Sequence, residues 1–170
     1  MKYFTPELWL GVNRPGEWQS GYKSWQESLD AYKAQLKDVL PKLSKRLQQF
    51  FTTESLHDGT LASLEVGDLL LRTKVSRKHR QAVVRIRAVP FDEKQLYEFE
   101  YRGIHTAEVN FPGAISLFPS GPKPNFGDWG YDELIINENG QLQHEILFAS
   151  GATVRIAFDQ LQIKTSALTT

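Results

Sequence analysis

The spacing of the apolar residues changes once along this chain of 170 residues, and that change constrains the fold more than any other feature. Between Trp18 and Leu43 apolar residues recur at alternating intervals of four and three, which places them on one stripe of a helix. After Thr60 apolar and polar residues alternate instead, which is typical of half-buried strands. The gaps between these strands are too short for parallel crossovers. The sequence therefore predicts an α+β fold with N-terminal helices packed on a curved, mostly antiparallel sheet (60–164).

The helical stripe is expected to form two helices, at about 18–39 and 42–51. Pro41 separates them, because it lacks a backbone donor and clashes with the preceding turn. Ser24 and Glu27 fit a capping box, so the well-formed part of the first helix is expected to begin near Trp25. The stripe is too short and too aromatic for a coiled coil, so we expect it to pack on the sheet.

Nine segments have the pattern of strands. They are 60–66, 69–74, 82–89, 96–102, 104–110, 131–136, 142–149, 153–158 and 161–164. One hairpin can be aligned residue by residue, with Arg87 opposite Glu98 and Arg85 opposite Glu100. This register places opposite charges on one face and apolar groups on the other. The two glutamates could also form an acid/base pair, but the arginines account for them without catalysis.

Length and composition limit the classes of protein to consider. A chain of this length is expected to be one domain (1–170), with a helical segment at 1–55 and a β-rich segment at 56–165. The 20 Lys and Arg balance the 20 Asp and Glu, which argues against a dedicated nucleic-acid binder. The chain has no cysteine, which excludes disulfides, thiolate metal sites and cysteine nucleophiles. No secretory signal and no membrane-spanning run is visible, so cytoplasmic localisation is expected.

Three short motifs together carry a resemblance to a known family. They are the opening run from Lys2 to Trp9, the aromatic helix with Trp25 and Tyr32, and Leu56-His57-Asp58 before the first expected strand. These motifs resemble a family of uncharacterised bacterial proteins that is described only as a domain of unknown function. The resemblance implies a bacterial cytoplasmic origin and supplies no activity. The order of helices and sheet is also loosely similar to that of some immunity proteins of bacterial toxin systems.

His57 and Asp58 are the most conspicuous polar pair. Adjacent His and Asp can bind a divalent metal, so a metal-assisted hydrolase that uses this pair and another histidine is one hypothesis. The remaining histidines, His79, His105 and His144, show no local spacing of metal ligands. The alternative is that Asp58 shapes the turn before the strand and that His57 bonds a nearby backbone group. We expect no metal and no cofactor.

The segment 111–130 is rich in glycine, proline and aromatic residues, and its length is unusual for a loop without a function. Phe126, Trp129 and Tyr131 could be anchors for a partner, because aromatic side chains dominate interface energies. They could equally close one end of the sheet as core residues. Both interpretations remain open from the sequence.

A run of basic residues precedes and enters the aligned hairpin (72–87). The basic residues of this run that have no glutamate opposite them in the aligned hairpin are Arg72, Lys74, Arg77, Lys78 and Arg80. Such a run could contact phosphates, so nucleic-acid binding is a further hypothesis. The alternative is a solvated hairpin, since the neighbouring arginines have glutamate partners and the net charge is zero.

The sequence favours a non-catalytic bacterial cytoplasmic domain that binds a protein or a small ligand. It lacks the Gly-x-Ser-x-Gly nucleophile elbow and any phosphate-cradling glycine loop. The metal-assisted hydrolase and the nucleic-acid binder remain as alternatives, and the loop 119–131 with its aromatic residues is the first surface to test.

Overall fold

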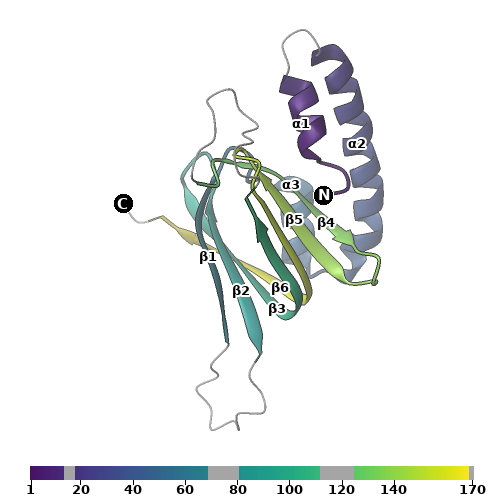
Figure 1. Ribbon diagram of the computed structural model, residues 1–170. Coiled ribbons are helices and arrows are strands. Elements are labelled where there is room, and N and C mark those ends of the chain that lie inside the picture. The colour runs from purple at the N-terminus through teal and green to yellow at the C-terminus, as the bar shows by residue number, and fades with distance from the viewer. Residues whose placement is uncertain (14–17, 69–80, 112–124, 169–170) are drawn as a thin grey trace, which may run out of the picture.

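The computed structural model describes residues 1–13, 18–68, 81–111 and 125–168, and it confirms the α+β class. The helices are α1 (Pro6–Asn13), α2 (Trp18–Val39), the short 3-10 helix η1 (Leu40–Lys42) and α3 (Lys45–Thr53). The strands are β1 (Thr60–Asp68), β2 (Ala82–Val89), β3 (Gln95–Asn110), β4 (Trp129–Ile136), β5 (Leu142–Phe148) and β6 (Thr153–Ala167). Figure 1 shows the helices gathered on one side of a curved sheet.

The six strands form one sheet in the order β1-β2-β3-β6-β5-β4, and all neighbours are antiparallel. The sheet curls until its first and last strands meet at one end. There Asp58 donates its backbone N–H to the carbonyl of Trp129 (2.8 Å), and Trp129 donates to the carbonyl of Gly59 (2.7 Å). A bridge between Thr60 and Asp128 continues this contact. We call this the edge junction.

The long helix α2 lies beside the outer strand β4 (Figure 1). The hydroxyl of Tyr32 accepts a hydrogen bond from the backbone N–H of Leu134 (3.1 Å), so the helix satisfies a donor on the free edge of β4. Helix α3 packs on the apolar side of the sheet, where Phe50 lies 5.2 Å from Phe99 between ring centroids. Glu54, just after α3, binds Arg46 and accepts from the Tyr97 hydroxyl (2.7 Å), which ties the helix to β3.

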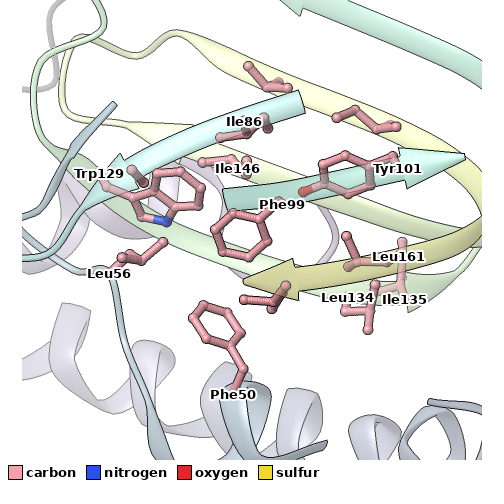
Figure 2. Packing of buried hydrophobic residues seen from close by; sticks show 14 of the residues in the cluster. Phe50, Leu56, Ile86, Phe99, Tyr101, Trp129, Leu134, Ile135, Ile146 and Leu161 are labelled. Carbon is pink, nitrogen blue, oxygen red and sulfur yellow. The ribbon is translucent and has the colours of Figure 1, made fainter. Parts of the chain in front are cut away.

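Most of the buried apolar residues form one large cluster that joins helices and sheet, and a second, smaller cluster contains Trp9, Leu147 and Ala149. Figure 2 shows Phe50 of α3 directed at Phe99, with Leu56 and Trp129 alongside. Leu56, Phe99 and Trp129 are completely buried. Because these groups come from α3, the connector before β1, β3 and β4, the helices and the curled sheet share one apolar interior.

The predicted register of the β2–β3 hairpin is confirmed at the aligned pairs, including Arg87 with Glu98 and Arg85 with Glu100. The division into nine strands is wrong in detail, because 96–102 and 104–110 form one strand and 153–158 and 161–164 form another. Residues 67–68, which separate two of the expected strands, are the end of β1, and the expected strand at 69–74 lies outside the described residues.

Helix α2 runs from Trp18, so the capping box at Ser24 and Glu27 does not mark its start. Pro41 does end it, as predicted, because the chain passes into η1 at Leu40. α3 then begins at Lys45, where the Ser44 hydroxyl accepts from the Leu47 N–H (3.4 Å) as an N-cap.

The first residues of the chain are held by a buried carboxylate of β4. Glu133 is fully buried and accepts the backbone N–H groups of Tyr3 (2.8 Å) and Phe4 (3.2 Å), and that of Lys2. These bonds satisfy three donors at the edge of the core, and they position Phe4 against α2.

We expect Glu133→Gln to lower the free energy of unfolding by about 1–3 kcal/mol, because the amide offers one acceptor oxygen where the carboxylate offers two. Urea denaturation measures the change. Glu138→Gln is the matched control, since Glu138 is exposed on the β4–β5 turn. Equal stability of the two variants would contradict the anchoring role of Glu133.

The ionised carboxylate of Glu100 makes the stability of the fold depend on pH. Burial alone would raise the pKa of Glu100, but hydrogen bonds from Arg85 (2.7 Å) and Arg102 (2.8 Å) outweigh burial and hold the pKa below its ordinary value. A carboxyl whose pKa is lower in the folded state stabilises the protein above the unfolded-state pKa, and this contribution is lost as pH falls through the folded-state pKa. Glu100→Gln should therefore destabilise the protein by about 1–2 kcal/mol at neutral pH, after discounting for the partly exposed arginines.

The destabilisation by Glu100→Gln should shrink when the same urea titration is repeated below about pH 4. Glu65 is an exposed residue of β1 that pairs with Arg87 of β2. Glu65→Gln should therefore change the free energy of unfolding by less than about 0.5 kcal/mol at either pH. A Glu100→Gln effect that is the same at both pH values would refute the ionic origin of the contribution.

Candidate functional site

A pocket of about 320 Å³ opens between the helices and the edge junction. Five of its seven lining residues are aromatic or aliphatic, and the other two are His57 and Asp58. The lining residues are Trp9, Val12, Tyr22, Trp25, His57, Asp58 and Tyr131. They come from α1, α2, the connector before β1, and β4, and we call this site the aromatic pocket.

Tyr131 is the centre of the ring contacts in the aromatic pocket. Its ring centroid lies 4.3 Å from that of Trp25, 5.4 Å from that of Trp9 and 4.6 Å from that of His57. Phe4 stacks on the same ring at 5.4 Å. The pocket wall is therefore built from rings that fix one another, which preorganises it.

A bulge in β4 directs Tyr131 into this site. The pairing of β4 with β5 shifts register between Trp129 and Tyr131, so the two side chains leave opposite faces of the sheet. Gly130 lies within the bulge, and a Cβ on it would stand 1.8 Å from Cζ3 of Trp9. The absence of a side chain at Gly130 thus makes the room that the Trp9 indole occupies.

The edge junction fixes His57 and Asp58. Asp58 has a positive φ of 62°, a conformation that Asp and Asn tolerate better than most residues, and its N–H bonds to Trp129. The next residue, Gly59, has no room for a side chain, because a Cβ would lie 2.6 Å from the Val89 carbonyl. His57 Nδ1 lies 3.0 Å from Asp58 Oδ2, so the pair forms one polar rim.

The electrostatics of the pocket are dominated by one carboxylate. Asp58 is the only Asp or Glu among the described residues that line the pocket, and no described lining residue is a Lys or Arg. Burial, and next the negative charge of Asp58, raise the pKa of Tyr131. The Tyr131 hydroxyl therefore stays neutral at physiological pH.

The structure brings together His57, Asp58 and Tyr131, which the sequence had placed in two separate hypotheses. Trp129 is completely buried and donates its indole N–H to Asp132 (3.0 Å), so it is a core residue and no exposed anchor. Phe126 packs on Phe148, with centroids 4.7 Å apart, and does not line the pocket.

Sequence reasoning missed Trp9 and did not assign Tyr22 or Trp25 to a site. The helical stripe did place Tyr22 and Trp25 on the helix face that turns toward the sheet. No pattern in the sequence indicated Trp9, because its position depends on the gap at Gly130, which only the folded chain reveals.

Within the described ranges, no three His, Asp or Glu side chains lie close enough together to hold a metal ion. His105 pairs with Asp159 (2.7 Å), far along the chain from His57. His79 lies outside the described residues. The metal-assisted hydrolase therefore gains no ligand set from the parts that the structure describes.

His144 belongs to a buried network that links the two halves of the sheet. Its Nδ1 lies 2.6 Å from the Tyr101 hydroxyl, and its Nε2 lies 3.1 Å from Asp132 Oδ2. Asp132 also accepts from the Trp129 indole. Tyr101 and His144 are fully buried, so no substrate reaches them, and the network serves to satisfy polar groups in the core.

The basic run is described only in part. Arg72, Lys74, Arg77, Lys78 and Arg80 lie outside the described residues. On the neighbouring strand, Arg85 binds Glu100 (2.7 Å) and Arg87 binds Glu98 (2.9 Å). Both arginines are thus engaged within the sheet.

A larger and more polar hollow of about 580 Å³ lies on the outer face of β3, β4, β5 and β6. Several of its charges are paired, since Glu145 binds the Met1 ammonium group (2.6 Å) and Arg155 lies 3.4 Å from both Glu145 and Glu108, while Arg155 Nε makes no hydrogen bond. A ligand there would have to displace these pairs, which makes this hollow the weaker candidate.

No protein-family model, no curated protein and no solved structure matches the chain. Among the described residues, no helix is both long enough and apolar enough to cross a lipid bilayer.

The role of Gly130 can be tested directly. Gly130→Ala should displace the Trp9 indole and lower the free energy of unfolding by about 1–3 kcal/mol, because the added methyl overpacks a filled site. Urea denaturation followed by tryptophan fluorescence measures both effects. Gly67→Ala is the matched control, since a Cβ there meets nothing within 4 Å. If Gly130→Ala is as stable as wild type, Trp9 is not seated as described.

Proposed function

We propose that this chain is a non-catalytic binding domain that holds a small ligand in the aromatic pocket. The observation that carries the proposal is the convergence of three aromatic residues, Trp9, Trp25 and Tyr131, with Asp58 on one cavity. These groups come from separate parts of the chain, as is usual for pockets that recognise small molecules. A volume of about 320 Å³ lies at the lower end of the usual range for such pockets.

The contacts at the site support binding more than catalysis. A general base needs a proton to remove from a bound group, and a nucleophile needs an activating base beside it. In the aromatic pocket, no Ser, Thr or Lys is among the described lining residues, so the His57–Asp58 pair has no such nucleophile beside it to activate. The bacterial and cytoplasmic origin expected from the short motifs stays a prediction.

The test uses three probes, choline, 3,3-dimethylbutan-1-ol and indole, with saturation-transfer NMR on the full chain. We expect at least one probe to bind and Tyr22→Ala to weaken it by about threefold or more, because this half-exposed ring lines the pocket. Val66→Ala, an exposed site at the far end of β1, should leave binding unchanged. Absence of binding by all three probes would overturn the proposal, and so would equal loss in both variants.

A further inference from the structure

We propose that the ligand of the aromatic pocket is a small soluble quaternary ammonium compound, an inference that rests on the binding function proposed above. The geometry that points to it is the placement of one carboxylate, Asp58, at the rim of a cavity walled by tryptophan and tyrosine. Recognition of quaternary ammonium groups by such aromatic walls is a general use of the cation–π interaction.

The wall of the pocket is suited to a bulky, weakly hydrated cation. Trp9 and Trp25 line the cavity and are otherwise buried residues of the fold, and Tyr22 lines it with more than half of its surface exposed. Tryptophan faces attract cations more strongly than other aromatic faces, and the attraction grows when water is excluded. A quaternary ammonium group also presents methyl groups to these rings, so it gains apolar contact together with electrostatic attraction.

The charge of the pocket selects for a cation. Asp58 is its only described lining carboxylate, and no Lys or Arg lines it within the described part of the chain. Lys23 follows Tyr22 on α2, and it does not line the pocket. Its Nζ lies 4.0 Å from Glu27 Oε1. A bound cation would therefore meet one negative charge and no described positive one.

The arrangement of Asp58 favours a quaternary ammonium over a guanidinium group. A guanidinium is recognised best by both oxygens of a carboxylate at once. Oδ2 of Asp58 already lies 3.0 Å from His57 Nδ1, so a guanidinium bound to both oxygens would share Oδ2 with His57. A quaternary ammonium donates no hydrogen bond and needs only the charge, which the His57–Asp58 contact leaves in place.

The test compares choline with 3,3-dimethylbutan-1-ol, which has the same shape with carbon in place of the charged nitrogen. Isothermal titration at about pH 8.5, where histidine side chains are ordinarily neutral, should show choline binding about tenfold tighter or more. Asp58→Asn should weaken choline about fivefold and leave the uncharged analogue unchanged. Asn tolerates the positive φ of this position, so the variant should keep the fold.

Two further variants separate charge from shape. Tyr22→Leu keeps an apolar group but removes the ring, and should weaken choline about threefold without weakening the analogue. Asp38→Asn makes the same charge change as Asp58→Asn on an exposed part of α2, about 20 Å along the helix from Trp25, and should have no effect on either probe.

The outcomes distinguish the two proposals. If the uncharged analogue binds as tightly as choline, the pocket binds ligands but the cation inference is overturned. If neither probe binds and indole does not bind either, the binding function fails with it. Co-sedimentation with phosphatidylcholine vesicles, and titration with a peptide that contains trimethyl-lysine, form the last arms. Binding to either of these without binding to free choline would overturn the assignment to a small soluble ligand.

Discussion

The edge junction is the contact on which the rest of the structure depends. Two backbone hydrogen bonds join residues 58–59 to Trp129, and they bring the outermost strands β1 and β4 together at one end. This contact curls the sheet over its own apolar side, where Trp129 and Phe99 lie fully buried. The same contact fixes His57 and Asp58 beside Tyr131. One backbone pairing therefore shapes both the core and the aromatic pocket.

The other edge of this arrangement is closed by side chains. As an edge strand, β4 would expose unpaired backbone groups, but the Tyr32 hydroxyl accepts from the backbone N–H of Leu134. The carboxylate of Glu133, on the same strand, accepts the backbone N–H groups of Tyr3 and Phe4. Phe4 is thereby placed against both Trp25 and Tyr131, with centroids 5.2 and 5.4 Å away. The polar anchoring of the edge and the aromatic contacts of the pocket thus support each other.

The sequence was sufficient for the fold class, the two long helical segments and the register of one hairpin, because each follows from a local period or from facing charges. The sequence was insufficient for the strand bounds where a bulge interrupts the alternation of side chains along a strand. β3 continues past Gly103, which has a φ of 63°, and past a bulge between Ile104 and Thr106, although this part of the sequence resembles a strand end.

The bulge at Gly130 had the same effect on the candidate site. The sequence placed Trp129 in the loop before an expected strand at 131–136, whereas β4 begins at Trp129, and its bulge sends Trp129 into the core and Tyr131 into the pocket. The stripe on α2 indicated an inward face but could not identify which of its aromatic residues border a cavity. The contribution of Trp9 depends on a contact between α1 and β4 that no local pattern encodes.

The most direct measurement of the central claim is a two-dimensional ¹H–¹⁵N spectrum of the indole N–H groups during a choline titration. Trp9 and Trp25 line the aromatic pocket, whereas Trp129 is sealed in the core and bonded to Asp132. The account predicts that the Trp9 and Trp25 signals shift together along one binding curve while the Trp129 signal stays in place. Unmoved Trp9 and Trp25 signals at saturating choline, or shifts confined to backbone signals of the polar hollow near Glu145, would contradict it.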